Sequence, residues 1–98
     1  MHYGLRIKTG FYETTLYDLS MLEGGILLAP YDNEANPIIK ILPEDLNCIT
    51  LTKKKHSEIE IKTRSLLFWG TFIEDTDLRA IYQELKKHVE AKVIYEEE

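Results

Sequence analysis

The sequence predicts a mostly β domain, α+β by content, in which seven short strands are followed by a single C-terminal helix. The helix is predicted at Glu74–Val93, where apolar residues recur three and four positions apart and charged residues fill the other face. The strands are predicted by short alternating or continuous apolar runs, separated by Gly, Pro, Asn and Asp. A chain of 98 residues has room for one core. We therefore expect a single domain over 1–95 and a frayed acidic tail at 96–98.

The first two strands are expected to form a hairpin. In His2–Lys8 polar and apolar residues alternate strictly, which is typical of a strand with one buried face. Thr9 and Gly10 supply a short turn, because glycine can adopt a positive φ. Phe11–Leu22 then returns as a strand rich in β-branched and aromatic residues.

Three short strands are predicted in the middle of the chain, each bounded by turn residues. Glu23, Gly24 and Gly25 end the second strand, and the continuous apolar run that follows suits a strand that is buried on both faces or lies near an edge. Asp32–Pro37 is the richest loop signal, because Asn and Asp favour turns and proline disfavours helical angles for the residue before it. The three strands are expected at Ile26–Ala29, Ile38–Leu42 and Leu46–Lys53.

Two further strands precede the helix, and the second of them is apolar on both faces. Glu58–Lys62 alternates cleanly, with its isoleucines on one side. In Leu66–Ile73 one face consists of Leu66, Phe68 and Phe72, and the other of Leu67, Trp69 and Ile73. We expect the first face to join the core and the helix to pack on the second. The alternative is an exposed aromatic patch for a partner.

The helix is predicted from its cap candidates and its apolar stripe. Asp75, Thr76 and Asp77 offer side-chain oxygens to the free backbone N–H groups of a helix N-terminus. The stripe consists of Leu78, Ile81, Tyr82, Leu85, Val89 and Val93. Because the double-faced strand lies just before it, we expect this helix to plug the sheet.

Seven short strands followed by one amphipathic helix resemble the pleckstrin-homology-like superfold, and the resemblance is strongest to its small bacterial members. The motifs that carry it are Ile39–Leu46 (Ile-Lys-Ile-Leu-Pro-Glu-Asp-Leu), Glu58–Ile61 (Glu-Ile-Glu-Ile) and the start of the helix at Asp77–Leu85. They lie within residues 38–90. The resemblance implies a bent seven-stranded antiparallel sandwich, or partly open barrel, that the helix closes at one end.

The chain departs from the lipid-binding members of that superfold at its first hairpin. Those domains carry basic residues on both strands, whereas here Arg6 and Lys8 match the first strand and Phe-Tyr-Glu opens the second. The tryptophan common in the helix of eukaryotic members is also missing, and Trp69 lies in the last predicted strand. The resemblance therefore does not imply binding of a lipid headgroup.

The charge distribution disfavours polyanionic partners. The net charge is −5, and residues 1–49 hold 3 Lys/Arg against 7 Asp/Glu, whereas residues 50–98 hold 9 against 10. Nucleic-acid or anionic-membrane binding would have to rest on one local cluster. The candidate anion-binding residues are Lys53, Lys54, Lys55 and Arg64. Their alternative role is a solvated hairpin tip that protects a strand edge from stray pairing.

No set of residues with catalytic or metal-binding spacing stands out. His2, His56 and His88 lack neighbouring ligands, and His88 is placed to pair with Glu84 on the helix. The serines lack a nucleophile context, and Cys48, the only cysteine, cannot form an intramolecular disulfide. We expect no enzyme, no cofactor and no metal.

The expected function is a non-catalytic interaction domain. No apolar run approaches the roughly 18–20 residues that span a bilayer, and the sequence shows no signal peptide, so we expect a cytoplasmic protein. We expect it to bind a protein partner or itself, through surface aromatic residues at Tyr12, Tyr31 and Trp69 and through open strand edges. The alternative is anion or phosphorylated-headgroup binding through the Lys53–Lys55 hairpin.

Overall fold

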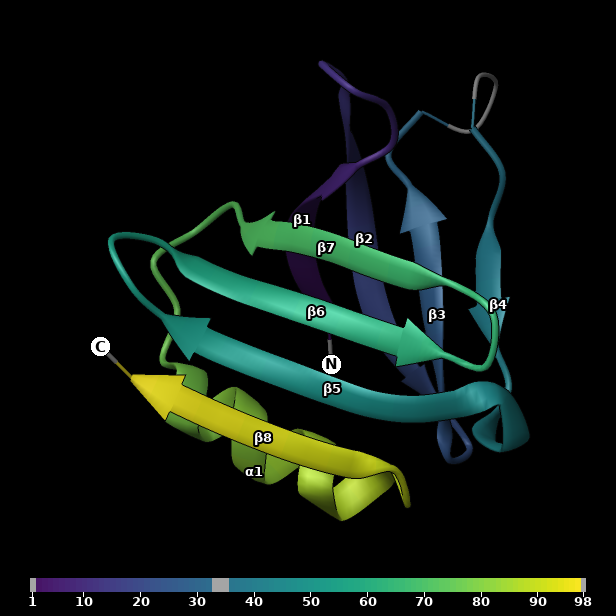
Figure 1. Cartoon of the computed structure of the whole chain (residues 1–98), viewed down its shortest axis with the longest axis vertical. Coiled ribbons are helices and arrows are strands. Elements are labelled where there is room, and N and C mark those ends of the chain that lie inside the picture. The colour runs from purple at the N-terminus through teal and green to yellow at the C-terminus, as the bar shows by residue number, and fades with distance from the viewer. Residues whose placement is uncertain (1, 33–35, 98) are drawn as a thin grey trace.

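The chain folds into one eight-stranded mixed sheet with a single helix, in a computed structural model that describes residues 2–32 and 36–97 (Figure 1). The elements in chain order are β1 (His2–Lys8), β2 (Thr14–Leu22), β3 (Gly25–Pro30), β4 (Ile39–Ile41), a 3-10 turn (Pro43–Asp45), β5 (Leu46–Lys53), β6 (Ser57–Thr63), β7 (Leu67–Phe72), α1 (Leu78–His88) and β8 (Lys92–Glu97). The prediction of a mostly β domain with a helix near its C-terminal end is confirmed.

Two antiparallel meanders meet at the centre of the sheet. The strand order is β4-β3-β2-β1-β7-β6-β5-β8, so the pairing of β1 with β7 joins the first four strands to the rest. In Figure 1 strands β2 to β4 run across the direction of β5 to β7, so the sheet bends at this junction. Gly70 permits the close approach, because a Cβ there would lie 2.8 Å from the carbonyl oxygen of Arg6.

The alternating patterns place one face of each strand in a common core. Leu5 and Ile7 of β1 are buried, as are the inward residues of β5 and β6. Helix α1 adds Leu78, Ile81 and Leu85 to the same cluster. β2 starts at Thr14, later than predicted, because Phe11 and Tyr12 belong to the exposed β1–β2 turn. The predicted Asp32–Pro37 loop includes Asn33–Ala35, which lie outside the described residues.

The predicted helix is too long at both ends. It begins after Asp77, whose carboxylate accepts hydrogen bonds from the backbone N–H groups of Arg79 (3.0 Å) and Ala80 (3.4 Å). It ends at His88, and Val89 already has extended backbone angles. Val93 continues the stripe only by coincidence of spacing. It belongs to β8, where β-branched and aromatic residues favour an extended chain.

Strand β8 was not predicted, and it is the one parallel neighbour in the described sheet. It runs alongside β5, with Cys48 opposite Lys92 and Lys53 opposite Glu97. Glu96 and Glu97 are therefore paired strand residues, which makes the prediction of a frayed tail wrong for them; Glu98 lies outside the described residues. That residues 1–95 form a single domain stays a prediction.

The helix does not cover the second face of β7, so this prediction is wrong. Helix α1 contacts β8 and β5 and closes the inner side of the sheet. The Tyr82 and Tyr95 rings meet edge to face, with centroids 6.2 Å apart. A side-chain hydrogen bond to Tyr95, followed by the charge of Glu97, raises the pKa of Arg79. The unpredicted strand thus supplies the surface that the helix was expected to find on β7.

Candidate interaction sites

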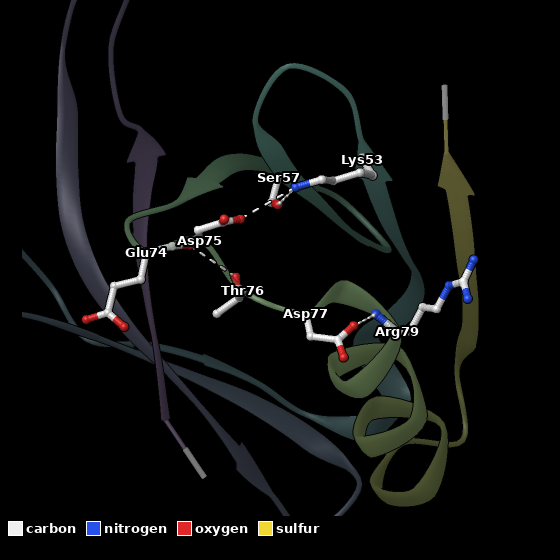
Figure 2. Close-up of polar contacts among 7 residues, drawn as sticks. All are labelled: Lys53, Ser57, Glu74, Asp75, Thr76, Asp77 and Arg79. Carbon is white, nitrogen blue, oxygen red and sulfur yellow. Dashed lines mark hydrogen bonds and ion pairs between the residues drawn. The ribbon is translucent and has the colours of Figure 1, made fainter.

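The predicted lysine cluster lies at the β5–β6 turn, where it meets acidic residues. Lys53 ends β5, and its ammonium lies 3.6 Å from a carboxylate oxygen of Asp75 and 3.4 Å from the hydroxyl of Ser57 (Figure 2). Lys54 and Lys55 are exposed at the tip of the turn. A hollow of about 280 Å³ beside them is lined by Lys53 and Lys55 but also by Glu74 and Asp75. The surroundings of this cluster therefore have mixed charge.

Arg64 does not join the lysine cluster. The register pairs Lys53 with Ser57 at one end of the β5–β6 hairpin and Leu46 with Thr63 at the other. Arg64 follows Thr63, and its backbone N–H donates to the carbonyl of Asp45 (3.0 Å). The structure thus places Arg64 at the opposite end of the hairpin from the three lysines.

The three predicted partner-surface aromatics occupy three separate places. Tyr12 is 92% exposed in the β1–β2 turn, with its ring edge to face against Phe11. Trp69 is 36% exposed on the outer face of β7. Tyr31 follows β3, and its backbone N–H donates to the carbonyl of Leu16 (3.0 Å). The structure does not unite them in one site.

The outer face of β7 combines apolar and acidic groups. Leu67 is 60% exposed and Ile73 is 37% exposed on the same side as Trp69. Trp69 lies opposite Glu60 of β6, which in turn lies opposite Thr50 of β5. A hollow of about 390 Å³ over these strands is lined by Trp69, Thr50, Thr52, Lys54, Glu58, Glu60 and others.

Sequence reasoning missed a pocket of about 370 Å³ that involves Tyr31. It lies between β1, Asp18 of β2 and the β7–α1 connection. The Nδ1 atom of His2 lies 2.6 Å from a carboxylate oxygen of Asp18. These two residues are 16 positions apart, and only the antiparallel register, which pairs Gly4 with Asp18, brings them together. A correct hairpin register was the one sequence-level signal that could have found them.

The other candidate residues have structural surroundings. His88 lies 3.3 Å from Glu84 one helical turn away, as predicted. Cys48 is a half-buried free thiol 3.8 Å from the hydroxyl of Thr50. Within residues 2–32 and 36–97, no group of three His, Cys, Asp or Glu side chains is placed to hold a metal ion. In the same part of the chain no helix is long and apolar enough to span a bilayer.

Comparison with known proteins shows a likeness of structure without a likeness of sequence. No protein-family model and no curated protein sequence matches the chain. A chain from the solved structure of the Spt16D Pob3N heterodimer is similar, with a TM-score of 0.72 and 10% sequence identity. The match covers 99% of this chain and 54% of that chain, so this chain spans about half the length of its structural relative. The strand arrangement, the helix near the C-terminal end and this match together show that the chain has a pleckstrin-homology-like fold.

Proposed function

We propose that this chain is a non-catalytic interaction domain that acts through protein–protein binding or self-association. The observation that carries the proposal is the uncovered outer face of β7, defined by Leu67, Trp69 and Ile73. These residues expose 60%, 36% and 37% of their surface, although Leu67 and Trp69 lie in a strand that is central in the sheet and Ile73 directly follows it. Large apolar side chains grouped on one face are a feature of protein-binding surfaces.

The composition of this face supports a protein partner over a small apolar ligand. Tryptophan is enriched at the centre of protein interfaces, whereas polar groups form the rim. Here Trp69 has Glu60 of β6 as its cross-strand neighbour, and Thr50 of β5 lies opposite Glu60 on the next strand. The structural relative is itself part of a heterodimer, which supports use of this fold in protein assemblies. A cytoplasmic location belongs to the same proposal, and the free thiol of Cys48 is compatible with it.

The alternative, anion binding by the Lys53–Lys55 hairpin, has weaker support. Asp75 lies 3.6 Å from the Lys53 ammonium and offsets its charge, and Glu74 lines the same hollow. An anion at this place would meet two carboxylates as well as the lysines. Lys54 and Lys55 are exposed and are the residues that would have to carry the binding.

Partner capture with surface variants tests the proposal. The wild-type chain, Leu67→Glu and Leu42→Glu would be immobilised and incubated with extract of the source cells, and retained proteins would be quantified. Leu67 lies on the outer face of β7, whereas Leu42 is an exposed leucine (42%) that follows β4 and serves as the matched control. We expect a retained protein, or a second copy of the chain, to be lost with Leu67→Glu and kept with Leu42→Glu.

Two further measurements distinguish protein binding or self-association from anion binding. Sedimentation over a range of concentrations would report self-association, and flotation with vesicles of anionic lipid would report anion binding. A strict monomer with no retained protein, whose vesicle binding is lost in Lys54→Glu and weakens with salt, would replace the proposal with the alternative.

A further inference from the structure

The pocket beside Tyr31 has a rigid floor made by backbone. Gly4 of β1 accepts a hydrogen bond from the backbone N–H of Ile73 (3.0 Å), which holds β1 to the end of β7. A Cβ on Gly4 would lie 2.7 Å from the Tyr31 hydroxyl and 3.0 Å from the Cδ1 of Ile73. The Tyr31 hydroxyl and the Ile73 side chain therefore occupy the space that a Cβ at position 4 would need, so only glycine fits there.

The walls of the pocket differ in polarity. Phe72 and Ile73 supply an apolar wall, and Phe72 is packed edge to face against Tyr3 with centroids 6.3 Å apart. Asp18 and Glu74 supply carboxylates, the first from β2 and the second from the β7–α1 connection. A site with an apolar wall and a few convergent polar groups is the usual form of a small binding pocket.

The polar groups of the pocket leave acceptors available to a ligand. His2 engages one oxygen of Asp18 through Nδ1, which fixes both side chains. Within the described part of the chain, the carboxylate of Glu74 and the hydroxyl of Tyr31 have no hydrogen-bond partner. Figure 2 shows the Glu74 side chain extending away from the Asp75–Lys53 contact, and Glu74 lines the pocket together with Gly4 of β1. The residues that line the pocket include His2 but no lysine and no arginine.

We propose that this pocket binds a primary ammonium or guanidinium group carried on an aliphatic stem. The carboxylate of Glu74, together with that of Asp18 beside His2, attracts a cation, and the Tyr31 ring and hydroxyl add a cation–π face and an acceptor. Phe72 and Ile73 offer an apolar surface along which a methylene stem packs. The pocket volume of about 370 Å³ lies at the lower end of the range for small-ligand sites, which fits one side chain.

Two sources can supply this chemistry, a free amine or the lysine or arginine side chain of a protein. The second source rests on the proposed function, because it makes the pocket the seat of one basic residue of the partner. It also places recognition on β1, β2 and the β7–α1 connection. This surface shares Ile73 with the outer face of β7, whereas Leu67 and Trp69 belong to the outer face alone.

Titration with small probes, followed by amide chemical shifts of the whole chain, tests the proposal. The probes are butylammonium chloride, N-acetyl-lysine methylamide and N-acetyl-arginine methylamide. N-acetyl-norleucine methylamide has the same stem without the charge, and butyrate has the opposite charge. A second arm compares a short Gly/Ser peptide containing one lysine with the same peptide containing norleucine.

We expect the cationic probes to shift the amides of Gly4, Asp18 and Ile73 with saturable curves, and the neutral and anionic probes to leave them unchanged. Glu74→Gln and Asp18→Asn should each weaken binding about fivefold or more, whereas Asp75→Asn, the neighbouring carboxylate outside the pocket, should not. A preference for the lysine peptide over the free amines would identify a protein source, and the reverse would identify a free amine.

Two results would overturn the proposal: no saturable shift at these amides with any cationic probe, or binding of butyrate in preference to butylammonium. These failures would leave the proposed function untouched if Leu67→Glu still abolishes partner capture. Conversely, saturable amine binding by a chain that retains no protein and does not self-associate would support the pocket and contradict the protein partner.

Discussion

Tyr17 has a buried phenol group that keeps its proton to a higher pH in the folded chain than in the unfolded chain. Its side chain is 1% exposed, and its hydroxyl donates to the carbonyl of Pro37 (3.2 Å). Burial raises the pKa of Tyr17, and burial followed by the charge of Glu84 raises the pKa of Tyr3. Above pH about 10 the unfolded chain releases these protons while the folded chain keeps them. The free energy of unfolding must therefore fall as the pH rises above that value.

Tyr17→Phe removes one of these protons and one hydrogen bond. At neutral pH the variant should be less stable by about 0.5–1.5 kcal/mol, because the Pro37 carbonyl loses its donor. Between pH 9 and 11 it should lose less stability than the wild type, as measured by urea unfolding at each pH. Tyr12→Phe, at a ring that is 92% exposed, is the control and should match the wild type at neutral pH. An alkaline loss in Tyr17→Phe equal to that of the wild type would contradict the assignment.

Asp77 and Asp75 are close in sequence but should differ in how much they contribute to the free energy of unfolding. Asp77 accepts from the N–H group of Arg79 (Figure 2) and from that of Ala80, which satisfies donors that the helix itself cannot. Asp75 is 94% exposed and makes one ion pair with Lys53. Asp77→Ala should lower the free energy of unfolding by about 1 kcal/mol. Asp75→Ala should change it by less than about 0.5 kcal/mol, because exposed ion pairs contribute little. Equal effects in urea unfolding would contradict the capping role.

At the scale of elements, the helix closes the core, and its inward residues have no alternative position. Leu85 is 0% exposed and lies in the same cluster as Leu5, Leu51 and Val93. Leu85→Asp would bury a carboxylate without a partner, at a cost comparable to the 5–15 kcal/mol that stabilises a typical domain. We expect no cooperative thermal transition in far-UV circular dichroism. Gln83→Asp, on the exposed side of the same helix, should melt cooperatively. A folded, cooperatively melting Leu85→Asp chain would contradict the role of α1 as a plug.

At the end of helix α1 the sequence pattern no longer distinguishes a helix from a strand. Val89 and Val93 lie four positions apart, which satisfies the helical period, yet the first caps the helix and the second is a strand residue. A run such as Val-Ile-Tyr is compatible with a strand, but a single six-residue strand is stable only beside a partner. That partner, β5, lies some forty positions earlier, as the pairing of Thr50 with Ile94 shows. Local periodicity carries no information about such a pairing.

At the scale of the whole molecule, the alternating strands and their buried faces could be predicted from the sequence, whereas the sites could not. Tyr31 and Trp69 were predicted as surface aromatics, and both are exposed. The contacts at the candidate sites, such as that of Asp18 with His2 and that of Asp75 with Lys53, join distant segments that only the sheet order brings together. The choice between a covered and an exposed outer face of β7 likewise depended on the unpredicted strand, since β8 gives the helix its packing surface.

The two meanders should unfold as one unit, because the buried residues of every strand belong to a single cluster. Trp69, the only tryptophan, reports on the β5–β8 half, and far-UV circular dichroism reports on the whole chain. We expect both probes to give the same urea midpoint. Ile26→Val in β3 and Ile49→Val in β5, each at a 0% exposed position, should each lower the free energy of unfolding by about 0.5–1.5 kcal/mol. Each should therefore lower the urea midpoint for both probes together. If Ile26→Val shifted the circular dichroism and left the Trp69 transition in place, the halves would be separate units and the prediction of one domain over 1–95 would be wrong.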